Sequence, residues 1–222
     1  MATFGALGGS NTFAGSSAAK TASLVLGGES NRIVIVTAGS IDGTLNTATF
    51  NGVNMTAVSG SPRTNGVIRA YMWYMLEAAL PGAGTYDASI TPGGTGRTGG
   101  FGVYYIYDAS QAAPEATGGG TGTSAGWTQN ITTVTDNAWI ADVVTSADRT
   151  YTVAGGQTER FDVTDGTDAT FAASTKVLAT AGLTTMGWTP SSSTNYAHHI
   201  AAFATAAGAA VKPKTLMTLG VG

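Results

Sequence analysis

Turn-forming dipeptides divide this chain into short apolar segments at intervals of roughly eight to twelve residues. Asn51-Gly52, which stands between two apolar runs, is the strongest short signal for a β-hairpin. No segment shows a convincing amphipathic helical period; Ser16–Ala22 and Ala197–Ala210 are the only weak candidates. Many short strands with frequent turns predict an all-β protein, either a sandwich or a barrel.

The densest apolar run is Ile68–Leu76, which contains one tryptophan, two tyrosines and no glycine or proline. A run without a polar face predicts a central strand that is covered on both faces. Asn65-Gly66 before it and Pro81-Gly82 after it favour a strand over a buried helix, because both dipeptides form turns. Arg32–Ala38 is rich in β-branched residues and predicts a second buried strand.

Two segments are alike, each with a polar turn that leads into an apolar run. Ser30–Val36 and Asp136–Ala141 share an asparagine just before the expected strand. Although the likeness is short, two equivalent halves are what a double Greek-key jelly roll would have. We therefore expect a jelly-roll-like antiparallel β-sandwich domain over residues 24–207.

The two ends of the chain lie outside this expected sandwich. Residues 1–23 are rich in glycine, alanine, serine and threonine and predict an extended N-terminal arm. Residues 208–222 contain Lys212-Pro213-Lys214, which breaks any strand, and predict a C-terminal tail. Within the sandwich, the glycine- and threonine-rich segment Ala113–Ala125 predicts a long surface loop.

Charged residues make up 10% of the chain, against about 25% in an average soluble protein. Small neutral polar groups must therefore cover the surface, and such surfaces suit neutral ligands, repetitive assemblies and subunit contacts. The net charge of -3 offers no basic footprint for nucleic acid. No cysteine is present, which excludes disulfides and thiolate metal sites. No export signal or membrane-spanning run is visible, so we expect synthesis in the cytoplasm and no membrane partner.

His198 and His199 are the only histidines. Neighbours on a strand point to opposite faces, so these two cannot share one metal ion, and we expect one packed and one exposed side chain. Asp162, Asp165 and Asp168 form the densest acidic cluster and are a candidate calcium site. Aspartate also favours turns, and a plain turn is the preferred interpretation. We expect no bound metal and no cofactor.

Other local patterns lack the context that their chemistry needs. Gly94–Gly99 matches a dinucleotide-binding loop, but a strand follows it where a helix is required, so a plain loop is preferred. Arg97 at the tip of this loop is a candidate contact with a ligand or partner. Glu159-Arg160 and Asp87 would be acid–base partners only if they faced each other. Trp127 follows a glycine- and threonine-rich segment and is the best candidate for an exposed, ligand-stacking aromatic. We expect no enzyme.

Several short segments occur in a characteristic order: Ser30-Asn31-Arg32 with the following Ile33–Val36, Thr49–Thr56, Met72–Leu76, Tyr107–Gln111, Asn137–Asp142 and Gln157–Arg160. Together they resemble a β-sandwich module that recurs in tailed-phage virion proteins and in bacterial surface proteins of phage-like composition. The resemblance covers roughly Leu24 to Phe203. Its motifs are strand starts and turns, and it transfers no catalytic residue.

The resemblance implies a structural virion protein: a capsid decoration (cement) protein, or a fibre-type or tail-associated protein that presents loops to the host surface. Its expected partners are the major capsid protein or other virion proteins, and its expected location is the virion. Symmetric shell positions favour a homo-oligomer, with a trimer preferred. The docking anchors that we predict are apolar residues of the two terminal segments: Phe4, Leu7, Phe13, Val211, Leu216, Met217 and Leu219.

Two other classes of function stay open. A receptor- or carbohydrate-binding module, for example for a host-surface glycan, needs exposed aromatic residues beside Asn, Asp and Thr at a concave face. A polysaccharide hydrolase or lyase needs converging carboxylates or a His–carboxylate pair, and it is the least favoured of the three.

Overall fold

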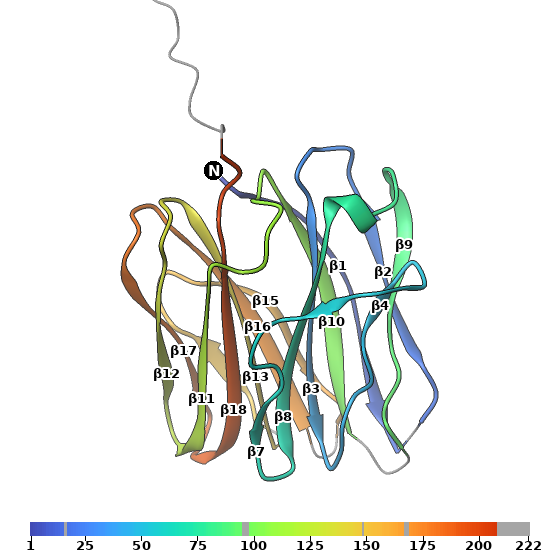
Figure 1. The fold of residues 1–222 in the computed structure, drawn as a ribbon. Helices are drawn as coiled ribbons and strands as arrows, with labels where there is room; N and C mark the ends of the chain where they lie inside the picture. Colours follow the sequence, from blue (N-terminus) through green and yellow to red (C-terminus); the bar gives the residue numbers. More distant parts are fainter. Residues whose placement is uncertain (16, 95–97, 148, 167–168, 208–222) are drawn as a thin grey trace, which may run out of the picture.

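The computed structural model describes residues 1–15, 17–94, 98–147, 149–166 and 169–207. These residues form four antiparallel β-sheets, which belong in pairs to two successive halves of the chain (Figure 1). The short 3-10 helix η1 (Glu77–Ala79) is the only helix among them. The described part of the chain therefore contains no helix that is long and apolar enough to cross a membrane. The predicted all-β fold is confirmed.

The first half contributes ten strands: β1 (Thr3–Ala14), β2 (Lys20–Leu26), β3 (Ile33–Ile41), β4 (Thr49–Phe50), β5 (Val53–Asn54), β6 (Thr56–Ala57), β7 (Arg63–Asn65), β8 (Ile68–Leu76), β9 (Gly84–Ile90) and β10 (Thr98–Tyr107). The first inner sheet has the order β1-β10-β3-β8-β6, and β7 also pairs with β8. The first outer sheet has the order β2-β9-β4-β5.

The second half contributes eight strands: β11 (Ala116–Ser124), β12 (Trp127–Thr132), β13 (Ala138–Ala147), β14 (Tyr151–Val153), β15 (Thr158–Thr164), β16 (Ala169–Leu178), β17 (Leu183–Pro190) and β18 (Thr194–Phe203). The second inner sheet has the order β11-β18-β13-β16-β15. The second outer sheet has the order β12-β17-β14.

Each half has the strand order of a jelly roll. If the eight principal strands of a half are numbered along the chain, both inner sheets contain the order 1-8-3-6 and both outer sheets contain 2-7-4. In the first half, strand 5 is β5 and completes the outer sheet. In the second half, strand 5 is β15, which crosses to the inner sheet and pairs with β16. The chain is thus a tandem of two jelly rolls.

Asn31 and Asn137 occupy equivalent places in the two halves, just before strand 3 of each jelly roll. Their backbones adopt the left-handed conformation, with φ of 57° and 58°. Asparagine tolerates this conformation better than most residues, because its short amide can hydrogen-bond locally. The two alike segments of the sequence therefore do mark two equivalent halves, but each half is a complete jelly roll and not, as expected from the sequence, one half of a single jelly roll.

Apolar side chains fill the spaces between successive sheets. On β8, Trp73 enters the first core, under the first outer sheet, and Tyr74 enters the central core between the two inner sheets. A third layer, between the second inner and second outer sheets, contains one cluster around Trp188 and another around Ile200. Ile68–Leu76 is β8 and is covered on both faces, as its sequence predicts.

The prediction of an N-terminal arm outside the sandwich is wrong for the described residues. β1 pairs with β10 as an edge strand of the first inner sheet, and β2 begins at Lys20. Two register shifts in β1 break the alternation of polar and apolar residues that marks a strand. The loop expected at Ala113–Ala125 likewise contains β11, which pairs with β18. The predicted tail, residues 208–222, lies outside the described residues.

Candidate functional site

A buried polar network lies between the second inner and second outer sheets. Asp142 Oδ1 accepts hydrogen bonds from the backbone N–H and the hydroxyl of Ser174, at 2.8 and 2.7 Å. Asp142 Oδ2 accepts from Trp188 Nε1 and His198 Nε2, both at 2.9 Å. All four residues are at most 1% exposed. The network joins β13, β16, β17 and β18.

The residue types of this network are those of a catalytic triad, but their arrangement is different. In a triad the histidine takes the proton of the serine hydroxyl, whereas here Ser174 and His198 both donate to the same carboxylate. No substrate can reach side chains that are this deeply buried. The four donors compensate the carboxylate for its lost hydration. We interpret the network as a structural tie within the second jelly roll.

His198 and His199 point to opposite faces of β18, as expected. The expectation that one of them is exposed is wrong, because both are fully buried. β18 belongs to the second inner sheet, which is covered on both faces, so neither face of the strand is in contact with solvent. His199 Nδ1 lies 3.1 Å from the carbonyl oxygen of Gly118. Burial, aided by the positive charge of Arg63, lowers the pKa of His199 to about 4.

Trp127, the predicted exposed platform, is buried instead, with an exposed fraction of 0%. It is the first residue of β12, and its ring faces inward, stacked on Tyr196 with centroids 4.8 Å apart. The indole Nε1 donates to the carbonyl oxygen of Ser124, at 3.1 Å. A tryptophan at the start of a strand can face either way, and here the inner sheet covers it.

Most of the predicted N-terminal docking anchors pack inside the folded chain and are not available to a partner. Phe13 is 1% exposed and belongs to the first core. Phe4 packs against the central core. Leu7 is 47% exposed and stays accessible on the surface. The other predicted contact residues lie outside the described residues: Arg97, Val211, Leu216, Met217 and Leu219.

The acidic segment between β15 and β16 closes a turn. The Asp165 backbone N–H donates to the Ala169 carbonyl oxygen, and Asp165 Oδ1 accepts from the Ala169 N–H, at 3.0 and 3.1 Å. Partial desolvation and the neighbouring Glu159 raise the pKa of Asp162 to about 6, although the residue stays open to solvent on one side. Asp168 lies outside the described residues. Among the residues that are described, no three His, Asp or Glu side chains gather as metal ligands would.

Asp87 and Glu159-Arg160 do not converge on one site. Asp87 lies on β9 of the first outer sheet, whereas the other two residues lie on β15 of the second inner sheet. The Arg160 guanidinium lies 3.7 Å from the centroid of the Phe4 ring, and Arg160 Nε donates to Thr175 Oγ1 at 2.8 Å. This arginine packs the two halves together.

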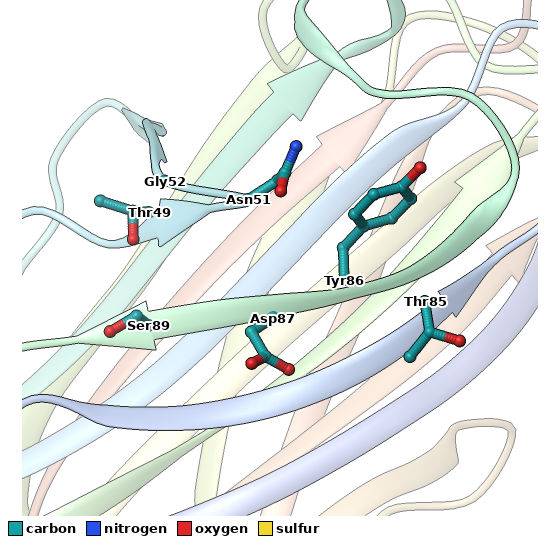
Figure 2. Close-up of a pocket in the computed structure, with 7 residues that line it drawn as sticks. All are labelled: Thr49, Asn51, Gly52, Thr85, Tyr86, Asp87 and Ser89. Atoms are coloured by element: carbon teal, nitrogen blue, oxygen red, sulfur yellow. The ribbon is translucent and has the colours of Figure 1, made fainter.

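A hollow of about 570 Å³ opens on the first outer sheet, between the β4–β5 hairpin and β9 (Figure 2). Strand β9 sends Thr85, Asp87 and Ser89 to one side, and Tyr86 rises on the other side next to the hairpin (Figure 2). The lining consists of small polar residues and one aromatic ring: Thr49, Asn51, Gly52, Thr85, Tyr86, Asp87 and Ser89.

The walls of this hollow are held by short-range contacts. Asn51 and Gly52 have φ of 48° and 75°, so the predicted hairpin turn is a tight one with two left-handed residues. The Asn51 backbone N–H donates to the Asp87 carbonyl oxygen at 2.9 Å. Ser23 Oγ donates to Asp87 Oδ1 at 2.5 Å. The Tyr86 ring meets Phe50 edge-on, with centroids 6.0 Å apart.

A second hollow, lined by Asp42, Gly43, Thr44, Val67 and Arg69, has about 360 Å³. The guanidinium of Arg69, which lines this hollow, already has hydrogen-bond partners: its Nη1 donates to the carbonyl oxygens of Gly43 and Val67 at 3.1 and 3.0 Å. These bonds tie two neighbouring loops together, which is a structural role.

Sequence reasoning missed the hollow on the first outer sheet. Asn51-Gly52 was recognisable as a turn, and the alternation of Thr85, Asp87 and Ser89 indicates a strand with one polar face. The pairing of β4 with β9 brings these segments together although they are far apart in the sequence, and no local sequence pattern indicates this pairing.

Comparison of the chain with protein-family models, with curated proteins and with solved structures finds no match. Its function is therefore inferred from its residues and their geometry.

Proposed function

We propose that the chain is a non-catalytic structural protein of a virion, of the capsid decoration or fibre type. The observation that carries this proposal is the central core, through which the two jelly rolls join by their inner sheets. The result is a rigid block whose two outer sheets lie on opposite sides (Figure 1). Jelly rolls are common in viral capsid and lectin domains. A fold alone does not define a function, so the surface chemistry has to agree.

The outer faces of the block carry neutral polar side chains. On the first outer sheet, Thr21, Ser23 and Thr85 are exposed, and on the second outer sheet Thr128 and Thr185 are exposed. Hydroxyl groups can be buried in a subunit contact at a lower desolvation cost than charges. Interface cores are depleted in charged residues for this reason. These faces are suited to stable contacts within a repetitive assembly.

The buried network around Asp142 supports a role without catalysis. It contains a carboxylate, an imidazole and a hydroxyl, and all three take part in hydrogen bonds that hold neighbouring strands together. A catalytic group must reach its substrate, directly or through one water.

Val134 and Leu183 are the proposed contact with the particle. They are 71% and 69% exposed, which is unusual for large apolar side chains on a surface of this kind. They lie at the same end of the second outer sheet, because Thr132 pairs with Leu183 and the Thr133 N–H donates to the Gly182 carbonyl oxygen. The partner would be the major capsid protein or another virion protein, bound by a homotrimer at a symmetric shell position.

Density-gradient purification of particles from cultures that produce the chain tests this proposal. We expect the chain to co-sediment with the particles and an antibody against it to label their surface in electron micrographs. The double variant Val134→Asp/Leu183→Asp should fold but stay in the soluble fraction. Val67→Asp, which changes an exposed valine in the turn between β7 and β8, outside both outer sheets, is the matched control and should still co-sediment. A wild-type chain that is found only in the soluble fraction would overturn the proposal.

A further inference from the structure

Within the described part of the chain, the hollow on the first outer sheet presents hydrogen-bonding groups that no protein partner satisfies. The side chains of Thr49, Asn51, Tyr86 and Ser89 make no hydrogen bond to other described residues, and Asp87 uses only Oδ1, toward Ser23. These groups line one hollow, with Asp87 and Ser89 on one side of β9 and Tyr86 on the other, and they come from two strands and one tight turn. They are free to bind a ligand that offers several donors and acceptors.

We propose that this hollow binds a neutral sugar residue, a role that goes beyond association with a particle and does not depend on it. A sugar ring presents neighbouring hydroxyl groups, each of which can donate and accept. Asp87 Oδ2 would accept from one hydroxyl, and the Asn51 amide would accept from one hydroxyl and donate to another. The Tyr86 ring would cover part of the apolar face of the sugar.

The charges around the hollow exclude the main competing ligands. No lysine or arginine is among the lining residues, and the Asp87 carboxylate would repel phosphate, sulfate or an acidic sugar. Calcium needs six to eight oxygen ligands, usually with several carboxylates, and this hollow has one carboxylate. An uncharged ligand rich in hydroxyl groups is what these side chains fit.

The groups are also held in place before any ligand arrives. The Asn51-Gly52 turn is tied to β9 by the bond from the Asn51 N–H to the Asp87 carbonyl oxygen. Ser23 fixes the Asp87 carboxylate, and Phe50 packs against the Tyr86 ring. Because the Asp87 carboxylate and the Tyr86 ring have little freedom left to lose, a weak ligand such as a single sugar can still bind measurably.

The second jelly roll provides an internal comparison, because it repeats the fold without the hollow. Its strand 5 crosses to the inner sheet, so no β4–β5-type hairpin stands beside β17. The strands β12, β14 and β17 contain no aspartate or glutamate. At the place of the Thr49 and Ser89 pair, the second outer sheet has the pair Thr152 and Thr189. The features that form the hollow are therefore not general requirements of the fold.

A nuclear magnetic resonance titration of the isotope-labelled full chain tests the proposal. The probes are the methyl glycosides of glucose, galactose, mannose and N-acetylglucosamine, with N-acetylneuraminic acid, inorganic phosphate and calcium chloride as charged competitors. We expect at least one neutral glycoside to shift the amide resonances of residues 49–52 and 85–89 saturably. The charged probes should leave them unchanged.

Two variants locate the site. Asp87→Asn removes the charge, and Asn51→Gly removes the amide while keeping a residue that favours the left-handed conformation. Each should weaken binding by about tenfold or more. Thr152→Ala, on the outer face of the second half, is the control and should bind like the wild type. The inference is overturned if no neutral glycoside gives saturable shifts there, if phosphate or calcium binds there instead, or if both variants bind with unchanged affinity. Because the titration uses the isolated chain, it is independent of whether the chain associates with particles.

Discussion

The ring of Phe4 stacks on the ring of Trp139, with centroids 5.9 Å apart and planes inclined by 14°. Phe4 belongs to the first strand of the first jelly roll, and Trp139 belongs to β13 of the second. The guanidinium of Arg160 also lies over the Phe4 ring, at 3.7 Å. The N-terminal strand therefore helps to hold the two jelly rolls together.

Replacing Phe4 should lower the stability of the whole chain. Phe4→Ala removes the stacking with Trp139 and the cation–π contact with Arg160, and we expect the free energy of unfolding to fall by about 3 kcal/mol. Denaturant-induced unfolding, followed by tryptophan fluorescence, measures this loss. The control is Leu7→Ala on the same strand, where a half-exposed side chain should cost no more than about 0.5 kcal/mol. Equal stability of both variants would mean that Phe4 serves a partner and not the fold.

Gly102 on β10 leaves room for the ring of Phe161 in the second half. A Cβ atom at position 102 would overlap that ring, so Gly102→Ala should overpack the contact between the halves and lower stability by about 1–3 kcal/mol. Gly126→Ala is the matched control, because its Cβ would meet no atom within 4 Å. If the clash is the cause, Gly102→Ala combined with Phe161→Ala should lose less than the sum of the single losses. Thermal unfolding of the four variants checks both points.

The elements that could be predicted from the sequence are those with a strong local pattern. Ile68–Leu76 has no polar face and is β8, and Asn51-Gly52 has the chemistry of the tight turn that it forms. The strands β1 and β11 could not be predicted in the same way. Both are first strands at the edge of an inner sheet, and glycines leave gaps in their side-chain pattern.

The candidate site was harder to predict from the sequence. Whether a side chain is buried, and which side chains come together, depends on residues that are far away along the chain. Trp127 looked like an exposed aromatic, yet its neighbour in space is Tyr196. His199 is buried because β18 lies between the first inner sheet and the second outer sheet, an arrangement that no nearby residue encodes. The hollow beside Asp87 likewise depends on the pairing of β4 with β9.

The network around Asp142 should matter for folding and not for turnover. Asp142→Ala would leave His198 and Trp188 without their acceptor in the core, and we expect a loss of about 3–5 kcal/mol. Ser174→Ala removes one of the donors to the carboxylate and should cost about 1–2 kcal/mol. Chemical denaturation at pH 7 measures both. An Asp142→Ala chain that unfolds at the wild-type midpoint would contradict the structural role and reopen the question of catalysis.

The buried His199 should make the fold sensitive to acid. Its pKa falls from an ordinary 6.5 to about 4 in the folded chain, so the unfolded chain binds protons more tightly. Stability from this residue is fully present above pH 6.5 and is lost as the pH falls toward 4, by about 2–4 kcal/mol in total. Asp162 acts in the opposite direction, because its pKa is raised to about 6 and its folded form prefers the proton.

Denaturation midpoints at pH 7, 5.5 and 4.5 separate the two residues. His199→Gln should flatten the loss of stability on acidification, whereas Asp162→Asn should make the loss slightly steeper. The Asp162 effect is expected to be small, since its side chain is exposed to solvent. A His199→Gln chain that loses as much stability on acidification as the wild type would show that His199 titrates normally and is more accessible than its position indicates.

The two jelly rolls should depend on each other for folding. Each inner sheet covers the other through the central core, which includes Ile35 and Tyr74 from the first half and Val143 and Phe203 from the second. A chain of residues 1–110 would expose one wall of this core as a continuous apolar face, which leads to aggregation. We expect the fragments 1–110 and 111–222 to be insoluble or to bind a hydrophobic dye when expressed separately, and to form a soluble complex when expressed together. A fragment that unfolds cooperatively near the wild-type temperature would show instead that each jelly roll is an independent domain, and that the central core is an ordinary interface between them.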